Sequence, residues 1–192
     1  MPSDRESAFA VWLTGLPASG KSTVARALAA ELGGKGIRAA ILESDALRRE
    51  IAPDAGYYDA ERDAFYATVA YLARVLVQHG VPVIVDATAN RRAYRDRARA
   101  AIPQFLEAHI RCPLAVCQAR DPKGIYRRGA EGTAQNVPGV SAPYEPPLTP
   151  EVVVDGERDD PSAAARQIVS ALEKKGYLPR GPGDAAKTGE SL

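Results

Sequence analysis

The sequence predicts an α/β protein with three layers, in which a mainly parallel sheet of five strands is covered by helices on both faces. Two observations lead to this prediction. Short apolar runs alternate with segments of helical periodicity along most of the chain, and the first apolar run leads through a glycine-containing turn into a helix. The length of 192 residues is that of one domain.

Each expected strand is an apolar run, and the longer helices carry apolar residues three and four positions apart. Gly80 ends the longest helix, and Pro103 ends an arginine-rich one. Two runs, 9–14 and 39–42, are apolar throughout and are expected to be buried on both faces. In chain order the expected elements are a strand at 9–14, a helix at 22–32, a strand at 39–42, a helix at 60–79, a strand at 81–85, a helix at 91–101, a strand at 105–110, a short helix opened by Pro113 and ending at 120, a strand at 152–154 and a helix at 162–175.

The segment 121–150 differs from its surroundings because it has many glycines and prolines, few aliphatic residues and no periodicity. A segment of that length in a compact domain is often a lid over a site. We therefore expect a single domain over 1–178 with a lid at about 121–150. The composition of 179–192 predicts a flexible C-terminal tail.

Composition limits the classes of partner. The 25 basic residues nearly balance the 24 acidic ones, so nucleic acid and anionic membranes are not expected partners. The first residues lack the pattern of a signal peptide, and no apolar run reaches the roughly 20 residues of a membrane span. The two cysteines, Cys112 and Cys117, are too few for a disulfide framework or a zinc site. We expect both to be buried, reduced thiols in a cytoplasmic protein.

Residues 15–22 read Gly-Leu-Pro-Ala-Ser-Gly-Lys-Ser and match the phosphate-loop pattern G-x-x-x-x-G-K-[ST] at each fixed position. A strand precedes the pattern and a helix follows it, as the motif requires. Backbone N–H groups of such a turn surround phosphate oxygens, and the helix N-terminus adds partial positive charge. Lys21 would reach the β- and γ-phosphates of ATP, and the Ser22 hydroxyl would bind Mg²⁺. The predicted nucleotide-binding residues are Gly15, Leu16, Pro17, Ala18, Ser19, Gly20, Lys21, Ser22 and Thr23.

Two aspartates follow expected strands and would therefore lie at the same edge of the sheet as the phosphate loop. Asp45 is a candidate to accept the proton of the acceptor hydroxyl or to hold Mg²⁺ through water, and capping of the following helix is its alternative role. Asp86 ends a Val-Ile-Val strand and is a candidate to orient Mg²⁺, with an ordinary turn as the alternative.

Arginines near this edge could bind an anionic acceptor. Arg48 and Arg62 are candidates to hold a phosphate or sulfate with paired hydrogen bonds, and solvated helix-face arginines are the alternative. Five further arginines lie in the 91–101 helix, most of them expected to face water: Arg91, Arg92, Arg95, Arg97 and Arg99.

Several segments together resemble adenylylsulfate (APS) kinases. Residues 12–23 resemble the opening of that family, and residues 117–126, C-Q-A-R-D-P-K-G-I-Y, resemble its C-x-x-R-D-P-K-G-L-Y segment. Residues 141–147 resemble its S-P-Y-E-x-P, and residues 175–178 its K-G-Y-L. The resemblance runs in order over nearly the whole chain.

The resemblance implies a phosphate-loop kinase fold and transfer of a phosphoryl group from ATP, with Mg²⁺, to the 3′-hydroxyl of adenosine 5′-phosphosulfate. It places Arg120 in the nucleotide pocket. It assigns Asp45, Arg48, Tyr57, Arg62, Lys123 and Gly124 to the acceptor site. It also implies a homodimer.

The chain departs from the family in the acceptor half. Glu43 and Ser44 replace the first two residues of D-G-D, and Phe65 replaces an asparagine. Residues 87–90 read A-T-A-N in place of F-I-S-P, so Ala89 stands at the family's serine. Residues 137–139 read V-P-G in place of F-T-G, which removes an aromatic ring expected on adenine. Two alternatives stay open: a kinase of the same fold that acts on another small anionic or nucleotide-like metabolite, and a non-catalytic nucleotide-binding sensor.

Overall fold

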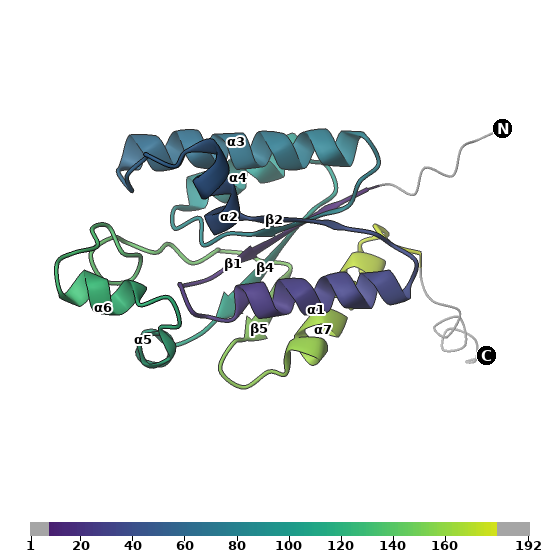
Figure 1. Ribbon diagram of the computed structural model, residues 1–192. Helices are drawn as coiled ribbons and strands as arrows, with labels where there is room; N and C mark the ends of the chain where they lie inside the picture. Colours follow the sequence, from purple (N-terminus) through teal and green to yellow (C-terminus); the bar gives the residue numbers. More distant parts are fainter. Residues whose placement is uncertain (1–7, 180–192) are drawn as a thin grey trace, which may run out of the picture.

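The protein was analysed as a computed structural model, which describes residues 8–179. A parallel sheet of five strands forms its centre, in the order β2-β3-β1-β4-β5. The three-layer α/β/α fold predicted from the sequence is confirmed (Figure 1). The strands are β1 (Ala10–Thr14), β2 (Ala40–Glu43), β3 (Val83–Asp86), β4 (Phe105–Arg111) and β5 (Val152–Asp155).

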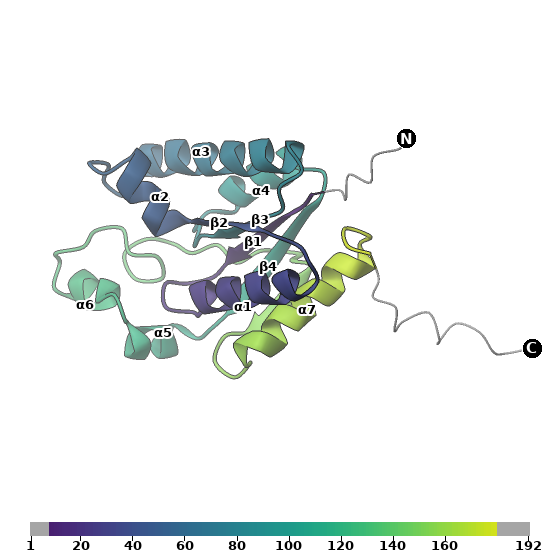
Figure 2. The same ribbon diagram turned by 45° about the vertical axis from the view of Figure 1, so that its right-hand side comes forward.

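Two pairs of helices cover the sheet. One face carries α1 (Lys21–Gly34) and α7 (Pro161–Lys174), and the other carries α3 (Asp59–Gln78) and α4 (Arg92–Ala101) (Figures 1 and 2). The remaining helices lie beyond the carboxyl ends of the strands: α2 (Ser44–Ile51), α5 (Leu114–Arg120) and α6 (Ile125–Ala130).

The central strand β1 is buried along its whole length, which explains its unbroken apolar sequence. Val11 and Leu13 pack into the core beneath α1 and α7, whereas Trp12 packs on the opposite face with residues of α3 and α4. Because β1 is held on both faces, the phosphate loop that follows it starts from a fixed point.

Two expectations about elements were wrong, and one alternative role is excluded. Strand β2 is not buried on both faces, because it is an edge strand and Ile41 is 41% exposed. Helix α6 forms within the segment expected to lack regular structure; its six residues are too few to show a periodicity. Helix α2 begins at Ser44, so Asp45 lies in its first turn and is not its cap.

The boundaries of the other elements differ from the predicted ones by at most two residues at either end. Apart from Pro179, the predicted tail at 179–192 falls outside the described residues. Between residues 8 and 179, none of the helices is both long and apolar enough to cross a membrane.

Candidate active site

The phosphate loop connects β1 to α1, and its backbone is shaped by glycine. Gly15 has φ 156°, and a Cβ atom there would lie 2.4 Å from the carbonyl oxygen of Ile110. Gly20 caps α1 with φ 104°, and Ala18 also adopts a positive φ, 62°. Lys21 Nζ donates to the carbonyl oxygens of Gly15 (3.1 Å) and Leu16 (2.9 Å). The loop therefore has the curved form in which backbone N–H groups can surround a phosphate.

Two charged side chains and one hydroxyl lie together at this loop, those of Lys21, Asp86 and Ser22. Strand pairing sets Asp86 of β3 beside Leu13 of β1, at the start of the loop. Burial lowers the pKa of Lys21, against the opposing effect of the Asp86 carboxylate. Burial raises the pKa of Asp86, and Lys21 and the hydrogen-bonded Ser22 hydroxyl oppose that rise. The two residues are 8% and 4% exposed, so each stabilises the charge of the other away from bulk water.

A hydroxyl and one carboxylate at this point fit Mg²⁺ bound to a nucleotide. Magnesium keeps several waters and is usually held by one or two protein groups together with phosphate oxygens. Among the described residues there is no cluster of three or more His, Cys, Asp or Glu side chains that would hold a metal without a nucleotide. Ser22 and Asp86 would therefore hold the metal jointly with the phosphates.

Asp45 meets the lid segment. Its carboxylate accepts a hydrogen bond from Lys123 Nζ at 2.6 Å, and Lys123 also lies 3.7 Å from Glu43. Tyr126, further along the same segment, donates from its hydroxyl to the carbonyl oxygen of Pro17 at 2.9 Å. The segment therefore contacts both the phosphate loop and the predicted catalytic carboxylate.

Arg48 and Arg62 lie side by side around Tyr57. The guanidinium carbon of Arg48 is 4.0 Å from the ring centroid of Phe65 and 4.7 Å from that of Tyr57. Arg62 lies 5.4 Å from the same tyrosine ring, which is about half exposed. Cation–π contact holds both guanidinium groups against the rings. The two arginines are buried, so neither is the solvated arginine that was their alternative reading.

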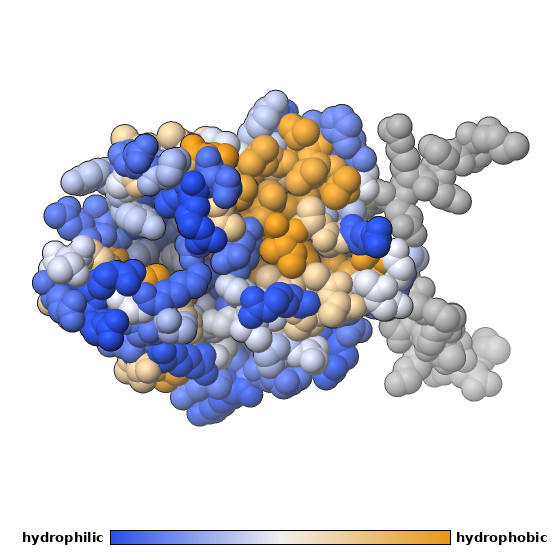
Figure 3. All heavy atoms as spheres, viewed as in Figure 1, coloured by the Kyte–Doolittle hydropathy of each residue, from blue (hydrophilic) through white to orange (hydrophobic). Residues whose placement is uncertain are grey.

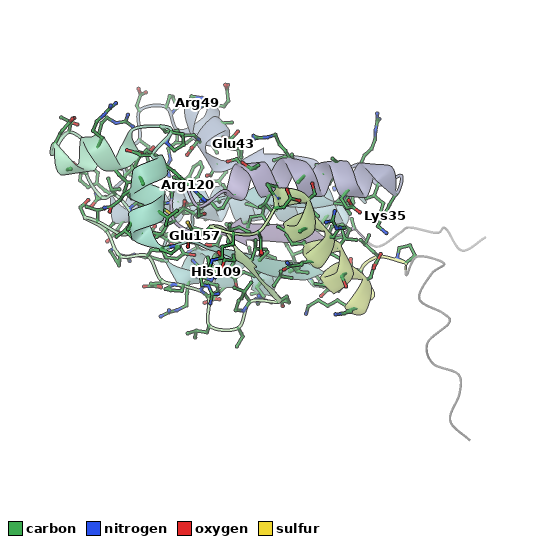
Figure 4. All side chains as sticks on the ribbon, turned by 90° about the horizontal axis from the view of Figure 1, so that it is seen from below. Lys35, Glu43, Arg49, His109, Arg120 and Glu157 are labelled. Carbon is green, nitrogen blue, oxygen red and sulfur yellow. The ribbon has the colours of Figure 1, made fainter. Side chains whose placement is uncertain are left out.

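Arg120 makes hydrogen bonds to backbone rather than standing free. It donates to the carbonyl oxygens of Gly156 (2.7 Å) and Glu157 (3.4 Å), and so ties α5 to the loop between β5 and α7. Figure 4 shows Arg120 beside Glu157, with Lys35 toward the other end of the molecule. A surface cavity of about 510 Å³ adjoins Arg120, Lys123 and Gly124.

The arginines of α4 take part in ion pairs and not in the site. Arg91, Arg97 and Arg99 pair with Asp59, Asp63 and Glu151. Arg92 lies 3.9 Å from Glu145. Four of the five side chains are 36–40% exposed, so the expectation that most of these arginines face water is confirmed, although each is also paired with a carboxylate.

The sequence names Arg95 only as one of five arginines, because nothing in an arginine-rich helix marks one member as internal. It is 1% exposed and pairs with Glu107 at 2.6 Å. Its other nitrogens donate to the carbonyl oxygens of Ala89 and Glu145. Arg95 thus joins the segment after β3 to the P-Y-E segment. The cysteine prediction, in contrast, is confirmed: Cys112 and Cys117 are buried free thiols.

Two of the substituted positions, Val137 and Ala89, are buried in the structure. Val137 is 3% exposed and packs with Cys112, Cys117 and Tyr126 in the small core of the lid segment, so it offers no ring to a base. Ala89 is fully buried with φ 42°, and its N–H donates to the Tyr66 hydroxyl.

Comparisons with known proteins agree with this geometry. The family model for adenylylsulphate kinase matches residues 7–155. The adenylyl-sulfate kinase of Gloeothece citriformis (strain PCC 7424) is 34% identical over 174 residues, which cover 91% of this chain and 99% of the relative. A relative in Sorangium cellulosum (strain So ce56), "Probable bifunctional SAT/APS kinase 2", is 36% identical over 91% of this chain, but the chain spans only 30% of that protein.

Among solved structures, the Mycobacterium tuberculosis APS kinase CysC in complex with AMPPNP and APS superimposes with a TM-score of 0.82 and 31% identity. The match covers 87% of this chain and 98% of that one. Motifs, fold and relatives therefore agree, and the chain belongs to the adenylylsulfate kinase family.

Proposed function

We propose that this chain phosphorylates the 3′-hydroxyl of adenosine 5′-phosphosulfate with ATP and Mg²⁺, yielding 3′-phosphoadenylylsulfate and ADP. The observation that carries the proposal is the meeting of two motifs far apart in sequence. The R-D-P-K-G-I-Y segment, residues 120–126, contacts the phosphate loop through Tyr126 and contacts Asp45 through Lys123. Donor and acceptor residues therefore share the carboxyl end of the sheet, where ligands of such folds bind.

On the donor side, residues 15–23 hold the phosphates of ATP and Lys21 neutralises charge on the β- and γ-phosphates. Ser22 and Asp86 would hold Mg²⁺, which would supply further charge neutralisation. Arg120 borders the nucleotide pocket through its position on α5.

On the acceptor side, Asp45 accepts the proton of the 3′-hydroxyl as its oxygen bonds to the γ-phosphorus and the bond from that phosphorus to the β–γ bridging oxygen breaks. Arg48 and Arg62 hold the phosphosulfate, and Tyr57 offers its exposed ring to the base. Lys123 and Gly124 close the site from the lid segment.

A coupled assay of ADP release tests the function. With saturating ATP and Mg²⁺, APS should accelerate ADP release at least a hundredfold over water as acceptor, and the product should carry a 3′-phosphate by mass spectrometry. Release that stays at the rate with water would refute APS as the acceptor.

The buried Val137 favours one competing acceptor class, small anionic hydroxyl compounds that need no ring for a base. A panel of such acceptors, run beside APS, distinguishes the two. ATP binding without ADP release to any acceptor would instead indicate a nucleotide sensor.

We also propose that the protein acts as a homodimer through the face around β2. The strand has one unpaired edge and apolar side chains at 40–42, with no proline and with Glu43 at its carboxyl end as its one charge. Figure 3 shows an apolar patch between α1 and α3 on the side of this strand. Ile41→Lys should convert a dimer to a monomer in sedimentation analysis, whereas Val153→Lys on the opposite edge strand should not. A monomeric wild type would contradict the proposal.

Finally, we propose that the protein acts in the cytoplasm. Two buried thiols without a disulfide support a reducing compartment. Fractionation of cells that express the tagged protein tests this, and recovery outside the cytoplasmic fraction would contradict it.

A further inference from the structure

The short segment that follows β3 lies between α3 and the distal part of the lid segment, residues 136–145. Asn90 ends this segment and is 2% exposed. Asparagine is seldom buried without bonded partners, because an unpaired amide costs about 1–3 kcal/mol. The partners of Asn90 therefore indicate what its burial accomplishes.

The oxygen and the nitrogen of the Asn90 side-chain amide both form hydrogen bonds, each with a different segment of the chain. Its Oδ1 accepts from Arg62 Nη1 at 2.7 Å, and its Nδ2 donates to the carbonyl oxygen of Pro143 at 2.9 Å. The backbone carbonyl of Asn90 accepts from the N–H of Glu145 at 2.8 Å. A flipped amide would set a donor against Arg62 and an acceptor against Pro143, so the network determines its orientation.

Arg62 completes the connection from the other side. Its Nη2 donates to the carbonyl oxygen of Asn136, at the start of the distal lid segment. Its Nε has no hydrogen-bond partner among the described residues and is buried. The guanidinium of an acceptor-site arginine is therefore held by two polar atoms of the protein, one from Asn90 and one from the lid, while its Nε has no partner among the described residues.

An ordinary structural asparagine would join two elements without touching a functional group. Asn90 instead bonds directly to a guanidinium that faces Tyr57. The proline of the related F-I-S-P motif has no side-chain amide, so it could not form these bonds.

We propose that Asn90 is a positioning residue, which orients Arg62 toward the acceptor and couples that orientation to the placement of residues 136–145. Binding of the acceptor anion and ordering of the distal lid then favour each other. The inference rests on the proposed function for the acceptor's identity, but the coupling itself concerns the protein alone.

Two variants of Asn90 separate its two bonds. Asn90→Ala removes both, whereas Asn90→Asp keeps an acceptor for Arg62 and replaces the donor to Pro143 by an oxygen. We expect Asn90→Ala to raise the KM for APS about tenfold, consistent with a lost bond to a charged group, and to change the KM for ATP less than twofold. Asn90→Asp should raise the KM for APS by a smaller factor. In hydrogen exchange of the free protein, both variants should exchange faster over 136–145 than wild type.

Arg97→Gln is the control, because Arg97 lies on α4, the helix that follows Asn90, in an exposed ion pair with Asp63. It should leave both KM values and the exchange rates unchanged. Equal increases of the two KM values in Asn90→Ala, or unchanged exchange over 136–145, would overturn the proposal. If wild type fails to turn over APS, the proposed function fails, whereas the exchange experiment still supports or refutes the coupling.

Discussion

At the residue scale, burial and charge have opposite effects on the pKa values of Lys21 and Asp86, beside the phosphate loop. Lys21 and Asp86 are both removed from water, which disfavours the charged form of each, and each partly restores the charge of the other. Replacement of one member leaves an uncompensated buried charge. Replacement of either residue should therefore lower the rate of catalysis and also destabilise the local structure.

Lys21→Met tests this pair. Turnover should fall by about two to three orders of magnitude, the cost typical of removing one donor to a developing charge. Steady-state ADP release measures it. Lys35→Met serves as the control, because Lys35 forms an exposed pair with Glu173 away from the site. An equal loss in both variants would mean that the effect is not local.

Cys117 should be chemically inert in the folded protein. Burial, together with a hydrogen bond to Cys112, raises the pKa of its thiol to about 12. At pH 8 its thiolate fraction is then roughly one part in ten thousand, and the thiolate is the reactive form. Iodoacetamide should label Cys117 only after unfolding, as seen by peptide mass spectrometry. Rapid labelling of the native protein would contradict this.

Residues of a local motif can be predicted from the sequence, whereas residues that act through distant partners cannot. Lys21 and Ser22 occupy fixed positions in a pattern whose local context a sequence carries. Asn90 and Arg95 act through carbonyl oxygens of residues some fifty positions away. No local pattern encodes such partners, so they emerged only from the structure.

At the element scale, the loop that follows β5 packs directly against the phosphate loop. A Cβ atom at Gly156 would lie 2.5 Å from the carbonyl oxygen of Ser19 and 3.0 Å from Ile110 Cγ2. The absence of a side chain there lets the two loops touch. The C-terminal part of the domain therefore takes part in shaping the nucleotide site.

Gly156→Ala should consequently destabilise the protein by about 1–3 kcal/mol through overpacking and raise the KM for ATP severalfold. Urea unfolding and ATP titration of turnover measure the two effects. Gly33→Ala is the matched control, since a Cβ in that part of α1 meets nothing within 4 Å. It should raise stability by about 0.5–1 kcal/mol. If Gly156→Ala changed neither the stability nor the KM for ATP, the two loops would not be in contact.

Elements were predictable to the extent that their signals are local. Strand β1 and helix α1 carry long apolar patterns, and the structure confirms them. An apolar run cannot reveal whether its strand is central or at an edge, which is why the exposure of β2 was misjudged. Helix α6 is too short to show a pattern.

At the scale of the whole molecule, two groups make stability depend on pH. Burial and the charges of Arg95 and Arg111 lower the pKa of His109 to about 4. Burial would raise the pKa of Glu151, but its hydrogen bonds, first of all with Arg99, lower it to about 2. In both cases the unfolded chain binds a proton more readily than the folded one, so acid favours unfolding.

The free energy of unfolding should therefore fall from pH 6.5 to 4 through His109 and from pH 4.5 to 2 through Glu151. Urea denaturation along a pH series measures this. His109→Gln should reduce the pH dependence of the unfolding free energy between pH 6.5 and 4. Glu151→Gln should reduce it between pH 4.5 and 2, and should also lower the stability at neutral pH. Profiles parallel to wild type would exclude these groups as the source.

The bonds of Arg95 also bear on how such an enzyme can change over evolution. One internal cation holds the backbone carbonyls of residues 89 and 145, and Glu107 in the sheet balances its charge. Side chains at 87–89 can then be exchanged while Arg95 still holds the backbone at residues 89 and 145. Selection for a different acceptor could therefore proceed by single substitutions there without moving the surrounding backbone. Loss of Arg95 would release the carbonyl groups of residues 89 and 145 and so remove this tolerance.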